Sequence, residues 1–432
     1  MRAAELTRQQ FLDRLAEPET FLWATGIEDT FITCPWPATG RTLDEYELTG
    51  HYDHWRQDLD RMASLGVRVA RYGVPWHRIN PATDTWDWSF ADATLGRMLE
   101  LGIDPIVDLV HYGLPAWIDG AYDHPDFPQY MAEYAARLAD RFCGRIRLYT
   151  PLNEPRVAAW FCGKIGWWPP HRRGWRGYLR VLLACCRGIV ETVRALHTVD
   201  PGIVPVHVDA TDLFDTADPA LESEAALRQE HVFLALDLMS GRVGPLHPLY
   251  AWVLRFGASE ADLAWFAEHA IDLPVIGINL YPMFSRKVLT RTSSGLRARM
   301  PYASADIVER LGEMYWRRYG APLLISETAS VGSVGRRRAW LADSVAAARA
   351  LRERGVPVVG YTWWPMFSLV TWAYRQGTAD AASYLRHMGL WDLRPGANGT
   401  LERVATPLVG EYQRLVAGGI DSVGRLAAAS VV

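Results

Sequence analysis

The stretches VRVARYGV at 67–74, SFADATLGRMLELG at 89–102 and DPIVDLVHY at 104–112 decide the fold. The first and third are short, apolar and rich in β-branched residues, whereas the second has helical spacing. This alternation is typical of βα units in a parallel sheet. The pattern recurs along the chain and predicts eight strands, at 21–26, 67–74, 104–112, 145–153, 203–209, 274–281, 321–327 and 356–364.

Stretches with helical spacing follow most of these strands, and several end at a glycine in the position of a helix cap, as at Gly320 and Gly355. The helices are expected at 54–66, 89–102, 127–142, 177–197, 304–320, 336–355 and 405–419. Eight strands with crossover helices close into a (β/α)8 barrel, a TIM barrel. The alternative is an open doubly wound sheet, but its glycine-rich loop after the first strand is absent. We expect one barrel domain over 1–420 and a disordered C-terminal tail over 421–432.

The composition indicates a soluble globular protein. Of the 432 residues, 49% are hydrophobic and 22% charged, and the net charge of -4 does not favour nucleic acid as a partner. No apolar stretch approaches the ~18 residues of a membrane span, and the N-terminus does not resemble a signal peptide, so a cytoplasmic location is expected. Five cysteines without paired spacing are expected to be reduced thiols. The 19 tryptophans would provide flat platforms for sugar rings.

Two acidic side chains follow predicted strands at the C-terminal edge of the barrel, where barrel enzymes carry their reactive groups. YTPLNEP at 149–155 places Asn153 and Glu154 there, and LLISETA at 323–329 places Glu327 there. Either glutamate alone could form a salt bridge or a helix cap. Together they suggest glycoside hydrolysis, which in its retaining form needs two carboxyl groups about 5–5.5 Å apart.

Six segments resemble the motifs of glycoside hydrolase family 1, in the same order, between about residues 20 and 415. YTPLNEP is similar to its acid/base motif TFNEP, and LLISETA is similar to its nucleophile motif ITENG. The other four segments are LGVRVARYGVPWHRINP at 65–81, VDLVHYGLPAWI at 107–118, VIGINLYP at 275–282 and GYTWWPMFSLVTWA at 360–373.

The resemblance implies a role for each matching residue. Glu154 would be the general acid/base and Glu327 the nucleophile. Asn153 would bond the sugar 2-hydroxyl, while Arg71 and Tyr281 would orient Glu327 and keep it ionised. The residues expected to line the sugar site are His111, Trp364 and Trp372.

Three positions depart from the family pattern. TGIED at 25–29 lacks the glutamine of the family's QIEG, Thr371 stands where the family has a sugar-binding glutamate, and Gly113 replaces an aspartate. We expect Glu28 or Asp29 to bind the sugar in place of these side chains. The reaction at C1 would be unchanged, whereas recognition of the remote hydroxyls would differ.

The sequence therefore predicts a retaining β-glycosidase that acts on a small-molecule glycoside or oligosaccharide and needs no cofactor. A metal site built from His51, His54 and His111 is a weak alternative, because metal-ligand spacing is absent. Two other functions stay open. The enzyme could transfer the sugar to an apolar acceptor beside Trp167 and Trp168, or the barrel could bind sugar without catalysis.

Overall fold

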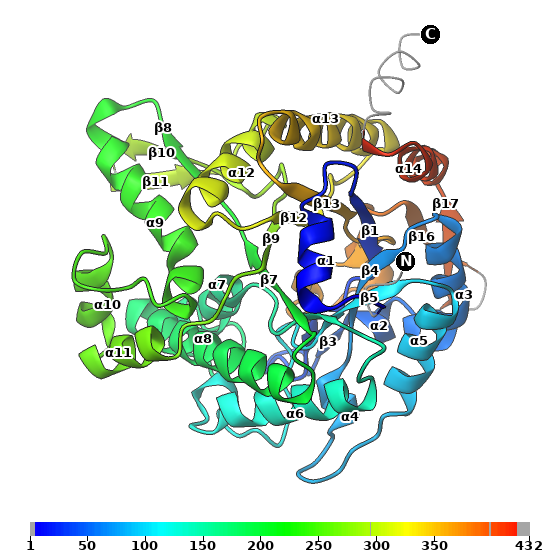
Figure 1. Ribbon diagram of the computed structural model, residues 1–432, viewed down its shortest axis with the longest axis horizontal. Coiled ribbons are helices and arrows are strands. Elements are labelled where there is room, and N and C mark those ends of the chain that lie inside the picture. Colours follow the sequence, from blue (N-terminus) through cyan, green and yellow to red (C-terminus); the bar gives the residue numbers. More distant parts are fainter. Residues whose placement is uncertain (1–4, 294, 397–398, 421–432) are drawn as a thin grey trace.

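The computed structural model describes residues 5–293, 295–396 and 399–420 and has a closed barrel of eight parallel strands at its centre (Figure 1). The order around the barrel is β1, β13, β12, β9, β7, β6, β5 and β4, with β1 pairing to both β13 and β4. The (β/α)8 prediction is confirmed, and each predicted strand overlaps one barrel strand, with β7 and β12 each ending one residue beyond the predicted range. These are β1 (Leu22–Gly26), β4 (Val69–Gly73), β5 (Asp104–Asp108), β6 (Leu148–Thr150), β7 (Val204–Ala210), β9 (Val275–Asn279), β12 (Leu323–Thr328) and β13 (Val358–Trp363).

Helices surround the barrel and cover its outer face (Figure 1). Their buried residues recur at helical spacing, as Ile307, Leu311 and Tyr315 do on one face of α12, which ends at Gly320 with φ 66°. Such a stripe packs against the strands while the opposite face meets solvent. The main helices after β1 are α3 (His51–Ser64), α5 (Ser89–Glu100), α6 (Phe127–Arg141), α8 (Gly174–Val199), α9 (Glu222–Met239), α12 (Asp306–Tyr319), α13 (Val334–Glu353) and α14 (Pro407–Gly418).

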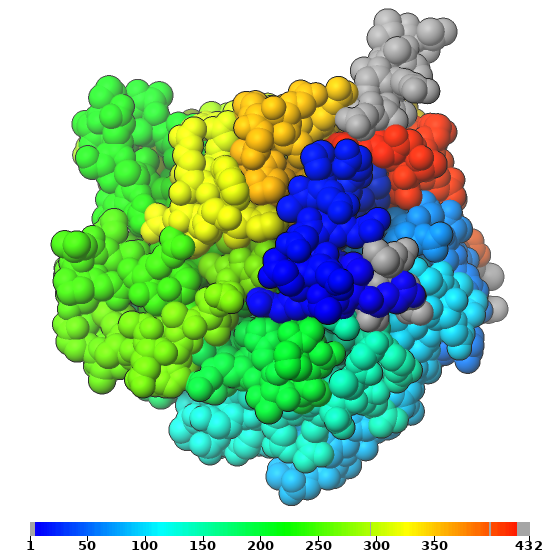
Figure 2. All heavy atoms as spheres, in the orientation of Figure 1, coloured from blue at the N-terminus to red at the C-terminus, as the bar shows by residue number. Residues whose placement is uncertain are grey.

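The short helix α1 (Arg8–Leu15) closes the bottom of the barrel. Phe11 and Leu15 of this helix join a buried cluster with Val69, Val204 and Val275, which are the first residues of their strands. Figure 2 shows this dark-blue segment across the centre of the visible face. The opposite end, where the strands finish, is therefore the mouth of the barrel.

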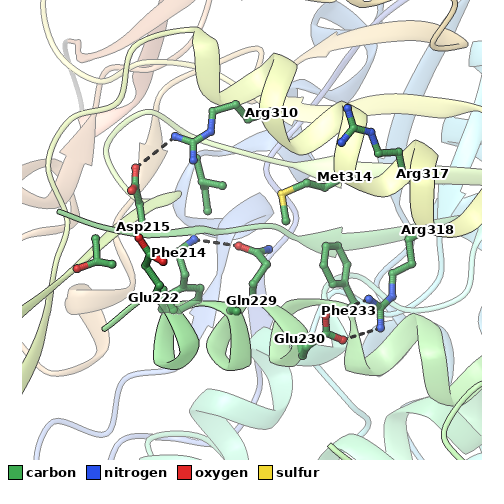
Figure 3. Close-up of a pocket in the computed structure, with 14 residues that line it drawn as sticks. Phe214, Asp215, Glu222, Gln229, Glu230, Phe233, Arg310, Met314, Arg317 and Arg318 are labelled. Carbon is green, nitrogen blue, oxygen red and sulfur yellow. Dashed lines mark hydrogen bonds and ion pairs between the residues drawn. The ribbon is translucent and has the colours of Figure 1, made fainter. Parts of the chain in front are cut away.

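A small three-stranded sheet formed by β8 (Leu213–Thr216), β10 (Arg286–Thr292) and β11 (Gly295–Arg299) lies outside the barrel. Beside it, a cavity of about 630 Å³ opens between β8, α9 and α12 (Figure 3). Its arginines are paired, Arg310 with Asp215 and Arg318 with Glu230. No residue predicted to act in catalysis lines this cavity.

The remaining elements are short and lie mainly in the connections. They are α2 (Glu45–Leu48), α4 (Trp76–Ile79), α7 (Pro155–Ala158), α10 (Tyr250–Phe256), α11 (Glu260–Glu268), β2 (Phe31–Ile32), β3 (Leu43–Asp44), β14 (Leu369–Val370), β15 (Leu385–Arg386), β16 (Trp391–Pro395) and β17 (Leu401–Ala405). Among the described residues, no helix combines the length and the apolar character needed to cross a membrane. All five cysteines are described, and each is free. The tail expected over 421–432 lies outside the described residues.

Candidate active site

Glu327 reaches the barrel mouth because β12 is irregular at its C-terminal end. Ser326 faces the interior, where its hydroxyl donates to Asn279 Oδ1 at 2.7 Å, so strict alternation would turn Glu327 outward. The pairing of β12 with β9 shifts its register between Ile325 and Glu327. Such irregularities redirect side chains beside active sites. The Glu327 side chain can therefore join the buried polar groups of the mouth.

Arg71 and Tyr281 hold the two oxygens of the Glu327 carboxyl group. Nη1 of Arg71, on β4, donates to Oε1, and the hydroxyl of Tyr281 donates to Oε2 at 2.7 Å. Nη2 of the same guanidinium donates to the carboxylate of Asp108 and, at 3.1 Å, to Asn153 Oδ1. A fully buried cation between two carboxylates favours their ionised forms.

Glu154 follows β6 and stands at the N-terminus of α7, with φ 48°. A non-glycine residue in this left-handed region costs about 1–3 kcal/mol, and such residues cluster at functional sites. Its Oε1 accepts from Asn279 Nδ2 at 2.8 Å, and its Oε2 accepts from the hydroxyl of Tyr112. Asn279 Nδ2 also lies 3.2 Å from Asn153 Oδ1, which joins Glu154 to the network around Arg71 and Glu327.

The two glutamates influence each other's charge. Burial raises the pKa of Glu327; Arg71 lowers it and the charge of Glu154 raises it, and the net result is about 8. Two buried carboxyls that repel in this way retain a proton more readily than separate ones. A proton is therefore retained beside Glu327 at neutral pH.

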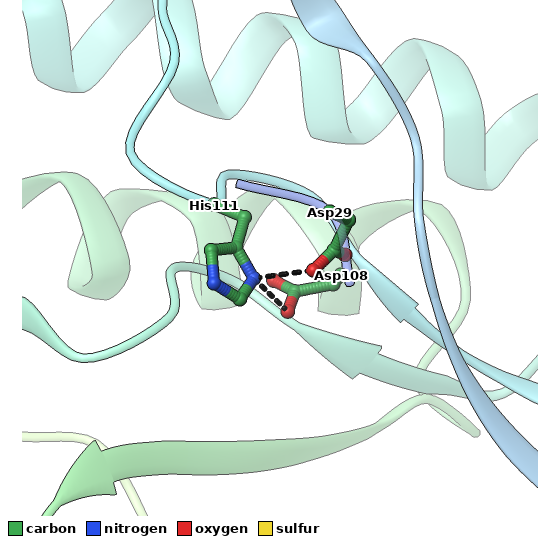
Figure 4. A group of neighbouring side chains, drawn as sticks. All are labelled: Asp29, Asp108 and His111. Atoms are coloured by element: carbon green, nitrogen blue, oxygen red, sulfur yellow. Dashed lines mark hydrogen bonds and ion pairs between the residues drawn. The ribbon is translucent and has the colours of Figure 1, made fainter. Parts of the chain in front are cut away.

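One ring nitrogen of His111 faces two buried aspartates (Figure 4). Its Nδ1 lies 2.6 Å from Asp29 Oδ1 and 3.3 Å from Asp108 Oδ2. Burial raises the pKa of Asp29 to about 6, although the nearby His111 lowers it. For His111, burial acts to lower the pKa, but the charges and hydrogen bonds of Asp29 and Asp108 outweigh it and raise the pKa well above the usual value.

The amide of Asn153 decides which nitrogen of His111 carries the proton. Asn153 Oδ1 accepts from Arg71, so its Nδ2 must face His111 Nε2, 2.9 Å away. An amide nitrogen is a donor, and Nε2 must therefore accept. The two aspartates favour a ring that is protonated on both nitrogens, whereas the contact with Asn153 requires Nε2 to be without a proton. We therefore assign a single proton, on Nδ1, which faces Asp29 and Asp108.

The Trp364 ring lies directly against Gly26, the position at which the family pattern has a glutamine. A Cβ added at Gly26 would lie 2.1 Å from the Trp364 ring, so only a glycine fits beneath it. The ring lies parallel to His111, with centroids 6.2 Å apart, and its Nε1 donates to Glu28 Oε2 at 3.1 Å. The other oxygen of Glu28 accepts from Thr30 at 2.6 Å.

Gly113, like Gly26, has no room for a side chain, since a Cβ there would lie 2.4 Å from the Phe31 carbonyl oxygen.

Trp372 contacts the network through aromatic rings. It packs edge-on against Tyr112, Phe161 and Trp168, with centroids 5.8, 5.1 and 5.0 Å away. We call these four residues the aromatic wall. Thr371 is half-buried, and its described hydrogen bonds are formed by the main chain, from its N–H to Tyr384 O and from Tyr374 N–H to its own carbonyl. The structure therefore brings Trp372, but not the Thr371 side chain, into contact with residues that touch Glu154.

The histidines proposed as metal ligands do not meet. His51 contacts Asp58 and Tyr72, each at 2.9 Å, and His54 contacts the Gly50 carbonyl. Two other clusters of described residues gather ligand-type atoms, namely Asp29, Asp108 and His111, and Glu230, Asp237 and His247. Each already contains a guanidinium, from Arg71 and Arg318 respectively. The donor sets therefore fit an arginine rather than a metal ion.

Three polar residues of the network were not predicted from the sequence: Asp108, Asn279 and Tyr112. Asp108 and Asn279 are the last residues of β5 and β9. The predicted strands 104–112 and 274–281 run past these two residues, so the rule that looked for polar side chains at strand ends did not select them. Tyr112 has φ 69°, in the loop after β5, and no local pattern indicates where its side chain points.

The chain is similar in sequence to several known proteins. Residues 24–235 match the model of glycosyl hydrolase family 1. Beta-glucosidase A of Thermotoga maritima is 25% identical over 363 residues, covering 75% of this chain and 79% of that protein. The 1,4-beta-D-glucan glucohydrolase of Thermotoga neapolitana is 23% identical, covering 75% and 83%.

Solved structures share the fold. The family 1 β-glucosidase from Thermotoga maritima superposes with a TM-score of 0.79 at 19% identity, covering 93% of this chain and 98% of that one. The β-glucosidase from the same organism in complex with glucoimidazole has a TM-score of 0.80 at 18% identity, with the same coverage. The family match over residues 24–235, the relatives along three quarters of the chain and the shared barrel all support a similarity to glycosyl hydrolase family 1.

Proposed function

We propose that the protein is a retaining β-glycosidase in which Glu154 is the general acid/base and Glu327 is the nucleophile. The observation that carries this proposal is the single hydrogen-bond network that joins the two glutamates through Arg71, Asn153 and Asn279. A structural salt bridge would need one carboxylate and one cation. Two mutually repelling carboxyls at one buried site instead suit acetal cleavage.

In the first step, Glu154 donates its proton to the glycosidic oxygen while Glu327 attacks the anomeric carbon. The bond from C1 to the leaving oxygen breaks, and a bond from C1 to the Glu327 carboxylate forms. In the second step, Glu154 removes a proton from water, which displaces Glu327 from C1. Two inversions return the sugar with its original β configuration.

The donors around each carboxyl support this division of roles. The Glu327 carboxyl accepts hydrogen bonds from a cation and a hydroxyl. The Glu154 carboxyl accepts them from a hydroxyl and a neutral amide. The guanidinium makes Glu327 the better carboxylate, so the shared proton belongs on Glu154. When Glu154 is neutral, its repulsion of Glu327 disappears, and Glu327 is available as a nucleophile.

Recognition of the sugar would fall to groups at the floor of the site. Asn153, His111 and Trp364 meet there, and the Glu28 carboxylate is held beside the indole of Trp364. Glu28 is the candidate replacement for the sugar-binding side chains that the family pattern has at the positions of Gly26 and Thr371. Asp29 is instead engaged with His111 and positions that ring.

Azide rescue tests the two assignments separately. Glu327→Gly should abolish hydrolysis of an activated aryl β-glycoside, and azide should restore turnover and yield the α-glycosyl azide. Glu154→Ala should retain the covalent intermediate, and azide should yield the β-glycosyl azide. Opposite products from the two variants support the roles, whereas wild-type turnover in either variant refutes its assignment. A sugar-binding protein without catalysis would give no product.

A second candidate, transfer of the sugar to an apolar acceptor, is favoured by the aromatic wall. Its rings extend from Tyr112, which touches Glu154, to Phe161, and Phe161 in turn packs against Trp167, which lies outside the wall and is 43% exposed. Aromatic surface beside the acid/base would hold an apolar alcohol better than water. Product analysis with a hydrophobic alcohol present separates the candidates, because release of free sugar alone excludes transfer.

A further inference from the structure

We propose that Tyr112 is a positioning residue for the acid/base, donating a hydrogen bond to Glu154 throughout the reaction as Tyr281 does to Glu327. This inference rests on the proposed function of Glu154. Tyr112 lies one residue after His111, in the loop that follows β5. Its hydroxyl contacts Glu154 Oε2.

The phenol ring of Tyr112 is held on several sides. Its side chain is buried, and the rings of His111 and Trp168 lie 4.8 and 5.0 Å from it. Its main-chain carbonyl accepts from the hydroxyl of Tyr122 at 2.9 Å, which fixes a backbone with φ 69°. The hydroxyl is consequently presented to Glu154 by a rigid support, and it cannot swing into solvent.

The direction of the hydrogen bond follows from its neighbours. The Nδ2 group of Asn153 has two hydrogens, and it contacts His111 Nε2 at 2.9 Å and Tyr112 Oη at 3.1 Å. Tyr112 Oη therefore accepts from Asn153, which leaves its own hydrogen for Glu154 Oε2. Burial and the charge of Glu154 raise the pKa of Tyr112 well above its usual value, so the phenol keeps this proton.

The two catalytic carboxyls therefore have matched supports. Each accepts one hydrogen bond from a tyrosine hydroxyl and one from a nitrogen donor. The donors to Glu327 are Tyr281 and Arg71, and the donors to Glu154 are Tyr112 and Asn279. The hydroxyl of Tyr112 should stabilise Glu154 most when it becomes a carboxylate, as its proton passes to the leaving oxygen. Tyr112 itself neither gains nor loses a proton.

Tyr112→Phe removes this hydroxyl and keeps the ring. We expect kcat/KM to fall about 10- to 100-fold for alkyl β-glycosides, whose departure needs protonation. For 2,4-dinitrophenyl β-glycosides, whose phenolate leaving group departs without protonation, kcat/KM should change by less than about 3-fold. The basic limb of the pH profile should move to higher pH, because the carboxylate has lost a donor. Equal losses on both substrates, or an unmoved basic limb, would overturn the proposal.

Tyr149→Phe is the matched control. Tyr149 lies on the same strand that leads to Glu154 and is fully buried, and its hydroxyl has no hydrogen-bond partner among the described residues. The control should leave both the substrate dependence and the pH profile unchanged.

A measurement that does not need turnover separates failure of this inference from failure of the proposed function. Carbon-13 NMR of the Glu154 carboxyl, assigned with Glu154→Gln, should show a higher titration midpoint in Tyr112→Phe than in the wild type. If that variant does not fold, 3-fluorotyrosine at position 112, a stronger donor, should lower the midpoint. An unchanged midpoint refutes the contact whether or not the protein hydrolyses glycosides.

Discussion

Arg71→Met would remove the guanidinium that lies between Glu327 and Asp108 while keeping most of the apolar volume of the side chain. Arg71 is fully buried, and the two carboxylates it contacts have side chains exposed by 5% and 0%. Both carboxyls would remain in the barrel mouth without a cation. Because Arg71 lowers the pKa of Glu327, its loss should raise that pKa further and hold the shared proton on the nucleophile instead of on Glu154.

The magnitude follows from burial. Breaking a buried ion pair by removing one partner costs about 3–5 kcal/mol, because the remaining charge is uncompensated. Asp108→Asn should cost less, about 1.5–3 kcal/mol, since the amide oxygen can still accept from Arg71. The double variant should be more stable than the sum of the two losses predicts, by about 1–3 kcal/mol.

Urea unfolding of the wild type, the two single variants and the double variant measures these values in one cycle, and hydrolysis of an aryl glycoside measures activity in parallel. We expect Arg71→Met to be both destabilised and inactive. Equal stability of Arg71→Met and the wild type, or a coupling energy near zero, would show that the guanidinium does not bridge the two carboxylates.

Two further predictions follow from burial and backbone contact. Beside Glu154, the pKa of Glu327 is raised from its ordinary value of 4.5 to about 8, so the two carboxyls together retain a proton that the unfolded state has lost. Stability should therefore decline between pH 4.5 and 8, by at most about 1.4 kcal/mol per pH unit, and Glu327→Gln should lack this decline in thermal unfolding. The reasoning fails if the variant and the wild type keep a constant difference in stability across that range. Gly113→Ala should destabilise the protein by about 1–3 kcal/mol, because its Cβ would lie 2.4 Å from the Phe31 carbonyl oxygen. Gly96→Ala on α5, where a Cβ meets nothing within 4 Å, is its control and should be neutral or stabilising.

The barrel strands could be predicted because each is a short apolar run, buried on both faces, between polar segments. The sequence did not predict α9. The consecutive residues Val232 to Met239 of this helix are all buried, so the sequence shows no apolar stripe at helical spacing. The sheet of β8, β10 and β11 was missed because strands such as RKVLTRT are half-exposed and polar. These elements depend on tertiary contacts that local periodicity does not record.

In the site, the sequence indicated residues at strand ends but not the network that links them. The contacts of Arg71 and Tyr281 with Glu327 are present, as the resemblance implied. The sequence could not separate Glu28 from Asp29, because both follow β1 and only the turn of the loop directs one to Trp364 and the other to His111. The roles carried over from the family remain predictions.

The bare backbone of Gly26 beneath Trp364 has a consequence for how this enzyme could diverge. A glutamine at position 26, as the family pattern has, would overlap the indole in its present position. The family pattern has a tryptophan at position 364 as well, so the indole would have to move rather than disappear, and its hydrogen bond to Glu28 opposes that movement. A return to the family's sugar site therefore requires the surroundings of Trp364 to change together with position 26.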